Sequence, residues 1–412
     1  MSGGMTVAQL GARMHYGVPR ILAKAGRLER LYTDICAVKG WPRLLGSLPQ
    51  SMRPARLRRL LGRVPQGIPA GRITAFTSFG LEYARRLARS HNSDTRNAAF
   101  LWAGREFCRR VIGCGLGQAR AVYVFNSAGL ELLHEARRRG IRGVLEQTIA
   151  PRQVEWKILA EEQARFPGWE AAAQAGLMQD YCAREAAEWA AADLVVCASD
   201  FVRDGIVACG GAAEKCVVVP YGVEQAATTT ARPPRRPGPL RVLTVGAVGL
   251  RKGSPYVMEA ARQLAGRAEF RMVGAVEVLP AAERQLRQHV ELAGVVPRSQ
   301  IRAQYDWADV FLLPSLCEGS ATVTYEALFQ GLPVICTRQT GSVIQDGADG
   351  FIVPAREPAA IAEKLELLAS SSERLSSLSE NARQTSLNCT LATYGKRLMS
   401  AFEAHGCLSP GG

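Results

Sequence analysis

The stretch from Asp309 to Cys336 constrains the fold more than any other part of the chain. Residues 309–313 are a short apolar run, which is the pattern of a strand buried on both faces of a parallel sheet. Residues 322–330 are typical of a helix, with Gly331 as its expected C-terminal cap and Pro333 just beyond it. Val334 to Cys336 begins the next strand. A strand, a helix and a second strand in this order predict the α/β class.

Two carboxylates flank the start of that helix. Glu318 is expected in the loop after the first strand, and Glu326 one to two helical turns further on. We expect both to look into the same crevice. Between them, the residues Gly319, Ser320, Ala321 and Thr322 stand at the helix N-terminus, where unpaired N–H groups and the helix dipole favour an anion. A phosphate between two hydroxyl-binding carboxylates suits a sugar nucleotide.

A second loop shares this phosphate-binding character. The apolar run 240–245 predicts a strand, and residues 256–264 predict a helix. The loop between them contains Gly246, Arg251 and Lys252. Glycine permits close approach of the backbone, and the two cations can hold a diphosphate.

Glu318-Gly319, the second Glu at 326 and the following Ala-Leu-Phe-Gln-Gly-Leu-Pro-Val-Ile resemble the Glu-x7-Glu motif of the family-4 retaining glycosyltransferases (glycosyl transferases group 1). The alternative is an ordinary strand–helix–strand unit with surface carboxylates. The resemblance implies the GT-B fold, in which two Rossmann-like domains face a central cleft. It also implies transfer of a sugar from a UDP- or GDP-sugar, with retention and without an essential metal or other cofactor.

The resemblance also implies roles for individual residues. Glu318 would orient the donor sugar, and Glu326 would hold the ribose hydroxyls. Arg251 and Lys252, together with the helix N-terminus after Gly319, would stabilise the leaving phosphates. The segment that contains Val296 is similar to the one that borders the base.

Several positions depart from the family pattern. Ala247 stands where arginine is usual, and Tyr221 where asparagine is commoner. Many relatives carry histidines at the ends of two strands where this chain has Asn126 and Glu146. Glu146 is therefore a candidate for binding an acceptor hydroxyl or for acting as a base.

The first loop also departs, because it lacks the usual paired glycines and carries Arg13 and His15 instead. It follows an apolar strand candidate at 6–10, at the edge of a sheet where ligands usually bind. His15 is therefore a candidate catalytic residue, and an ordinary exposed histidine is the alternative.

The chain is long enough for two cores, and its clearest linker is the polar, proline-rich run 226–239. We expect an N-terminal acceptor-side domain over 1–225 and a nucleotide-sugar domain over 240–387. A last helix within 388–412 is expected to cross back onto the first domain. Residues 40–75 are rich in proline, arginine and leucine, and predict an amphipathic excursion from the first domain.

The formal net charge is +14, and nine arginines between residues 53 and 89 face few acids. No nucleic-acid motif accompanies them, so the expected partners are an anionic membrane surface or a phosphorylated acceptor, with a plain solvated basic face as the alternative.

The eleven cysteines show no metal-ligand spacing, which favours free thiols in a reducing cytosol. No signal peptide or membrane span is recognisable, so we expect a cytoplasmic protein that attaches peripherally, if at all, to the inner face of the plasma membrane.

The resemblance to enzymes of bacterial polysaccharide and glycolipid assembly suggests a saccharide or a lipid-linked saccharide as acceptor. Two other classes fit the same architecture. A sugar-nucleotide epimerase would need an acid and base in the cleft, for which Glu146 is the available support. A catalytically inactive nucleotide-sugar-binding scaffold would be consistent with Ala247 and the missing histidines.

Overall fold

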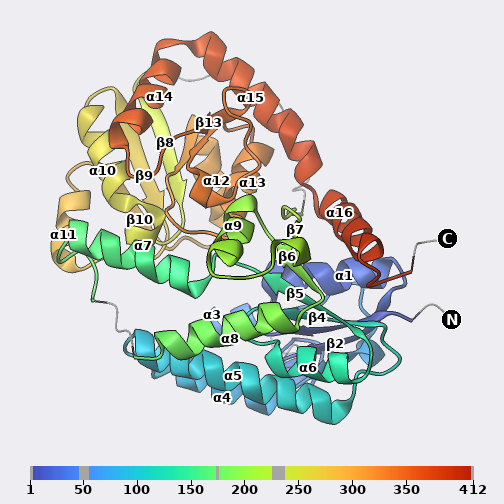
Figure 1. Ribbon diagram of the computed structural model, residues 1–412. Coiled ribbons are helices and arrows are strands. Elements are labelled where there is room, and N and C mark those ends of the chain that lie inside the picture. The colour runs from blue at the N-terminus through green and yellow to red at the C-terminus, as the bar shows by residue number, and fades with distance from the viewer. Residues whose placement is uncertain (1–2, 46–54, 173–175, 225–236, 410–412) are drawn as a thin grey trace.

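The computed structural model describes residues 3–45, 55–172, 176–224 and 237–409, and it contains two parallel sheets with helices on both faces (Figure 1). The expected α/β class is therefore confirmed. The linker at 226–239 and the middle of the excursion at 40–75 fall largely outside the described residues.

The N-terminal sheet has seven strands among the described residues, in the order β3-β2-β1-β4-β5-β6-β7, and every neighbouring pair is parallel. The order reverses between β1 and β4, which is where open parallel sheets bind ligands. The strands are β1 (Met5–Gln9), β2 (Leu28–Thr33), β3 (Ile73–Ala75), β4 (Ala121–Phe125), β5 (Arg142–Gln147), β6 (Leu194–Cys197) and β7 (Cys216–Val218).

Helices cover this sheet and connect its strands. Ser199 caps α9 as expected, because its hydroxyl accepts the Val202 amide at 3.4 Å. The helices are α1 (Gly17–Lys24), α2 (Trp41–Leu45), α3 (Ala55–Leu61), α4 (Thr77–Ala88), α5 (Ser93–Cys114), α6 (Leu130–Arg138), α7 (Arg152–Arg165), α8 (Met178–Ala191) and α9 (Asp200–Ala208).

The C-terminal sheet has six strands among the described residues, in the order β10-β9-β8-β11-β12-β13, again all parallel. The strand predicted at 240–245 is β8, and the strand that opens the Glu318 stretch is β11. The strands are β8 (Leu240–Val245), β9 (Ala268–Val273), β10 (Glu291–Gly294), β11 (Val310–Leu313), β12 (Val334–Cys336) and β13 (Gly350–Ile352). The helices are α10 (Ser254–Gln263), α11 (Pro280–Leu286), α12 (Arg298–Trp307), α13 (Thr322–Phe329), α14 (Pro358–Ser370), α15 (Ser372–Ser386) and α16 (Leu391–Ala404).

Two helices join the halves by crossing between them. The last helix, α16, leaves the C-terminal domain and packs on α1 and β4, where the rings of Phe402 and Tyr123 lie 5.6 Å apart (Figure 1). In the opposite direction, α7 belongs to the N-terminal sequence but lies against the C-terminal domain. Its Glu162 accepts hydrogen bonds from Tyr256 at 2.6 Å and Arg356 at 2.7 Å.

Candidate active site in the cleft

The centre of the cleft is an ion triad that the two predicted loops build together. Lys252 Nζ lies 2.6 Å from Glu318 Oε1, and Arg251 Nη1 lies 2.7 Å from the same oxygen. Arg251 also donates to the Cys317 carbonyl at 2.9 Å. Lys252 and Glu318 are 8% and 9% exposed, so their charges are weakly screened by solvent. The structure therefore brings together three of the residues selected from the sequence.

Glycines let the two loops approach this closely. Gly253 adopts a left-handed backbone (φ 73°), and a Cβ there would lie 2.2 Å from the Pro314 carbonyl oxygen. Gly246 (φ 147°) leaves room for the Lys252 side chain, whose Cε would lie 3.1 Å from an added Cβ. The Lys252 ammonium thereby reaches Glu318 from within its own loop.

Glu326 lies on the first turns of α13 and borders a separate cavity of about 300 Å³. The Tyr305 hydroxyl donates to its carboxylate at 2.9 Å. Burial raises the pKa of Glu326, and the hydrogen bond from Tyr305 and the charge of Arg298 oppose that rise. Thr322 lines the same cavity.

The expectation that Glu318 and Glu326 share one crevice was wrong. Glu318 borders a larger cavity of about 790 Å³, and Glu326 borders the smaller one. The loop after β1 runs between them: Gly11 and Arg13 line the larger cavity, whereas Ala12, Met14 and His15 line the smaller one. Consecutive residues of that loop thus line different cavities, which the spacing of the two glutamates could not reveal.

His15 lies in the smaller cavity, in direct contact with Arg298 through its Nε2 atom. The backbone of Met14, His15 and Tyr16 is left-handed at each residue (φ 47°, 50° and 61°), a conformation that costs non-glycine residues about 1–2 kcal/mol apiece. Desolvation, and secondarily Arg298, lower the pKa of His15. A neutral ring can accept a hydrogen bond from the Arg298 guanidinium.

Glu146 does not reach the cleft, which corrects its assignment as an acceptor-binding residue or base. Its side chain is buried, and its two carboxylate oxygens accept hydrogen bonds from Tyr123 and Tyr221, each at 2.5 Å. Two departures from the family pattern, Glu146 and Tyr221, are therefore partners of each other. Burial raises the pKa of Glu146, while the two tyrosine hydrogen bonds oppose the rise.

The remaining predicted site residues surround the same cleft. Gly319 lies against the N-terminal domain, where an added Cβ would be 1.9 Å from the Thr148 carbonyl oxygen. The Ser320 hydroxyl bonds to Tyr325 at 2.6 Å and to the Gly341 carbonyl at 3.0 Å, so this side chain is engaged internally. The Ala321 amide donates to the Thr340 carbonyl at 3.1 Å. Val296 is half-buried in the short segment between β10 and α12.

Sequence reasoning missed Arg298, which lines the smaller cavity, and Tyr305, whose hydroxyl donates to Glu326. Both lie on α12, which follows the segment proposed to border the base. They are the first and eighth residues of that helix, and together they form no recognisable sequence motif. The available signal was Pro297, which favours a helix start directly before Arg298.

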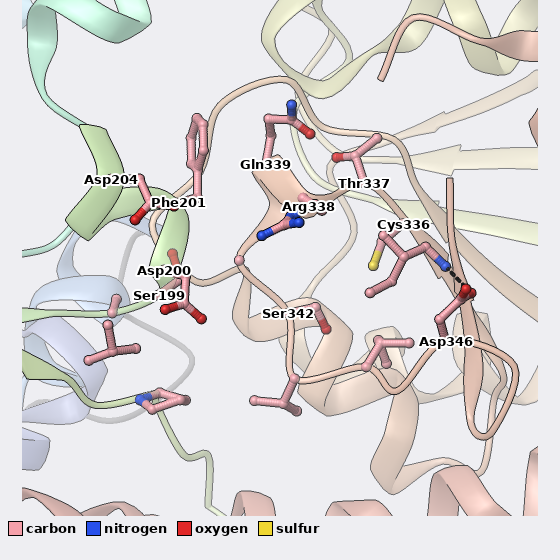
Figure 2. Close-up of a pocket in the computed structure, with 17 residues that line it drawn as sticks. Ser199, Asp200, Phe201, Asp204, Cys336, Thr337, Arg338, Gln339, Ser342 and Asp346 are labelled. Atoms are coloured by element: carbon pink, nitrogen blue, oxygen red, sulfur yellow. Dashed lines mark hydrogen bonds between the residues drawn. The ribbon is translucent and has the colours of Figure 1, made fainter. Parts of the chain in front are cut away.

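A third cavity of about 670 Å³ lies between α9 and the loop after β12. Figure 2 shows Asp200, Phe201 and Asp204 on the α9 side, opposite Arg338 and Gln339. Ser199 lines this cavity and donates to the Gly319 carbonyl at 2.5 Å. The same hydrogen bond ties the N-terminal domain to the loop that carries Glu318.

Within the described ranges, no group of three or more His, Cys, Asp or Glu side chains is placed to hold a metal ion. None of the helices in the described part of the chain is both long and apolar enough to cross a membrane.

The architecture is that of known glycosyltransferase structures, and the class of the fold is GT-B. HepE of Anabaena in complex with UDP aligns with 98% of this chain and 100% of its own, at a TM-score of 0.61 and 14% identity. Sucrose-phosphate synthase from Thermosynechococcus elongatus aligns with 98% of each chain, at a TM-score of 0.61 and 16% identity. At these identities the likeness establishes the fold alone.

The sequence of the C-terminal domain is similar to one family, because residues 239–371 match the family model described as Glycosyl transferases group 1. Among curated proteins, the chain is 31% identical over 193 residues to the putative colanic acid biosynthesis glycosyltransferase WcaL of Salmonella typhimurium, covering 42% of this chain and 47% of that protein. It is 30% identical over 173 residues to the amylovoran biosynthesis glycosyltransferase AmsK of Erwinia amylovora, covering 38% and 42%. The matches thus span less than half the length of these relatives. The predicted resemblance to group 1 and the GT-B fold is confirmed.

Proposed function

We propose that this chain is a family-4 retaining glycosyltransferase, which moves a sugar from a nucleotide-sugar to a saccharide or lipid-linked acceptor. The observation that carries the proposal is the convergence of Lys252 and Arg251 on one oxygen of Glu318 in the cleft between the domains. Two cations held at one point suit the two phosphates of a leaving nucleoside diphosphate. The relatives named for colanic acid and amylovoran biosynthesis support a place in bacterial polysaccharide or glycolipid synthesis.

The donor is proposed to lie along both cavities. Its nucleoside would occupy the smaller one, with the ribose hydroxyls on Glu326 and the base near Val296, while its sugar would enter the larger one beside Glu318. The diphosphate would then lie between the two cavities, at the N-terminus of α13. A UDP-sugar is the first donor to test, since the similar HepE was crystallised with UDP and with UDP-glucose.

The proposed chemistry is a same-face substitution. The bond between the sugar C1 and the diphosphate oxygen breaks, and C1 forms a bond to the acceptor oxygen. The departing diphosphate takes the acceptor's hydroxyl proton, while Arg251 and Lys252 balance the negative charge that develops on it. The two cations supply this charge, so the proposal requires no metal.

The epimerase alternative depended on Glu146 as an acid or base, and that residue is buried between two tyrosines. We also propose that the protein is cytoplasmic and lies at the inner face of the membrane, because α4 carries exposed arginines. An inactive scaffold is the outcome that the following experiment would reveal.

The test measures the release of nucleoside diphosphate from a panel of UDP-, GDP- and ADP-sugars, with and without a saccharide acceptor. We expect one donor to be consumed, and Lys252→Ala to reduce its consumption at least 100-fold. The matched control Lys24→Ala, an exposed lysine on α1, should leave the rate unchanged. Binding of a nucleotide-sugar without its consumption would instead support a scaffold. Retention is tested separately by the anomeric configuration of the product, measured by NMR.

A further inference from the structure

The third cavity, between α9 and the loop after β12, has polar side chains on two facing walls. Asp200 and Asp204 stand on the α9 wall, and Arg338 and Gln339 stand on the wall opposite (Figure 2). The volume of about 670 Å³ lies within the range of small-molecule sites, roughly 300–1,000 Å³. Among the described residues, this cavity shares no lining residue with the two cavities in which the donor is proposed to lie.

The polar groups on both walls can still bind a ligand. Neither the Arg338 guanidinium nor the Gln339 side-chain amide forms a hydrogen bond or an ion pair with another described residue. On the α9 wall, Arg203 pairs with Asp200 and with Asp204, each at 2.9 Å. Each of these carboxylates retains lone pairs for further hydrogen bonds. Hydrogen-bond donors on one wall therefore face acceptors on the other.

The opposite charges of the two walls select the class of ligand. A simple anion would be repelled by the carboxylates of Asp200 and Asp204, and a simple cation by Arg338. A hydroxyl group both donates and accepts hydrogen bonds, so a neutral polyol can satisfy both walls at once. Phe201 is half-buried on the α9 wall, where its ring can pack against the C–H groups of a sugar. These groups together suit a neutral saccharide.

The cavity lies next to the loop that carries Glu318. The Gln339 carbonyl accepts the Glu318 amide at 3.1 Å. From the N-terminal domain, the Ser199 hydroxyl lines the cavity and donates to the Gly319 carbonyl at 2.5 Å. A ligand in this cavity would therefore contact both domains beside the hydrogen bonds that join them.

We propose that the third cavity is a second saccharide-binding site, which holds a neutral saccharide between the two domains. The ring of Phe201 packs on one face of a sugar. Arg338 and Gln339 donate to its hydroxyl groups, and the carboxylates of the α9 wall accept from them. This inference goes beyond the proposed function and does not depend on sugar transfer by this chain, because the site is separate from the proposed donor site.

The test measures binding to the full chain, without nucleotide, by saturation-transfer difference NMR. The neutral probes are the disaccharides lactose, maltose and cellobiose. Glucuronate, glucosamine and free glutamine represent an anion, a cation and a zwitterion. We expect at least one disaccharide to bind, and all three of the other probes to bind at least tenfold more weakly than it does.

Two variants locate the bound disaccharide. We expect Phe201→Ala and Arg338→Ala each to weaken its binding at least tenfold. The matched controls are Val207→Ala, at an exposed position of α9, and Arg284→Ala, an exposed arginine of α11. Both controls should bind the disaccharide as the wild type does. Thermal unfolding checks that each variant is folded.

Unchanged disaccharide binding by either folded site variant would place the saccharide elsewhere and overturn the proposal. The proposal would also be overturned if none of the three disaccharides bound, or if glucuronate, glucosamine or glutamine bound more tightly than all of them. The proposed function is tested by release of nucleoside diphosphate, which none of these binding measurements uses. Failure of one proposal is therefore distinguishable from failure of the other.

Discussion

At the scale of single residues, Glu318 holds two cations that the proposed donor must also use. Replacing it by glutamine removes the charge that competes with the diphosphate and leaves Arg251 and Lys252 without their carboxylate. We therefore predict that Glu318→Gln binds nucleoside diphosphate two- to tenfold more tightly while sugar transfer falls at least 100-fold. Calorimetry with the diphosphate checks the first part. Weaker binding would mean that Glu318 positions the cations for the ligand instead of competing with it.

Glu146 gives a prediction about pH. Burial raises its pKa above the ordinary value of about 4.5, so the folded chain binds the proton of the Glu146 carboxyl group more tightly than the unfolded chain does. Stability from this residue is then fully present below pH 4.5 and declines as the pH rises toward the raised pKa. Each unit of difference corresponds to about 1.4 kcal/mol.

Glu146→Gln is neutral at every pH and can keep a hydrogen bond to each tyrosine, so this decline should be absent from the variant. Urea unfolding of both proteins at pH 5 and pH 8 measures this decline. The free energy of unfolding of the wild type should fall more between pH 5 and pH 8 than that of the variant. Parallel behaviour of the two proteins would contradict a raised pKa at this position.

The sequence predicted the ion triad's members because each stands in a loop with its own recognisable pattern. It did not predict that Glu146 is buried, because the partners that bury it, Tyr123 and Tyr221, lie 23 and 75 residues away. Arg298 was missed for a related reason. Its role depends on the loop that carries His15, 283 residues earlier, and no local pattern records that contact.

At the scale of elements, the strands and helices followed from apolar runs and caps, and the strand predicted at 334–336 coincides with β12. The start of α16 depends on a contact between distant segments. The Val223 amide donates to the Cys389 carbonyl at 2.9 Å, and the Leu391 amide donates back to Val223 at 2.9 Å. Gly222 makes this crossing possible, since an added Cβ would lie 2.2 Å from the Thr390 carbonyl oxygen.

We predict that Gly222→Ala lowers the free energy of unfolding by about 2–3 kcal/mol, because overpacking at this backbone contact cannot relax through a flexible side chain. Thermal unfolding measures the effect. Gly113→Ala is the matched control: a Cβ at that position in α5 meets no atom within 4 Å, so the change should be neutral or stabilise by up to about 1 kcal/mol. An equal loss of unfolding free energy in both variants would show that the contact between Gly222 and Thr390 is not the cause.

At the scale of the whole molecule, the two domains meet at Gly319. A Cβ added at this residue would lie 1.9 Å from the Thr148 carbonyl oxygen, and the Gly319 carbonyl accepts a hydrogen bond from the Ser199 hydroxyl at 2.5 Å. The residue has no left-handed backbone, so alanine there adds a collision between domains without straining the loop. Gly319→Ala is therefore expected to fold with a wild-type Tm to within a few degrees but to hold the domains further apart.

Small-angle X-ray scattering measures this separation as a larger radius of gyration for Gly319→Ala than for the wild type. An unchanged radius would show that the loop moves aside instead. The strand–helix patterns of the two halves predicted the α/β class, and the GT-B class was expected from the resemblance carried by Glu318-Gly319 and Glu326. The presence of two cavities in the cleft was not predictable, because it depends on where the loop after β1 meets distant parts of the chain.

The central claim is that the cleft binds a nucleoside diphosphate through Lys252 and Glu326. The most direct measurement is thermal stabilisation of the wild type, Lys252→Ala, Glu326→Ala and the control Lys24→Ala by UDP, GDP and ADP. We predict that one nucleotide raises the Tm of the wild type and of Lys24→Ala, and that both site variants unfold cooperatively but lose that shift. An equal shift in all four proteins, or none with any nucleotide, would contradict the account.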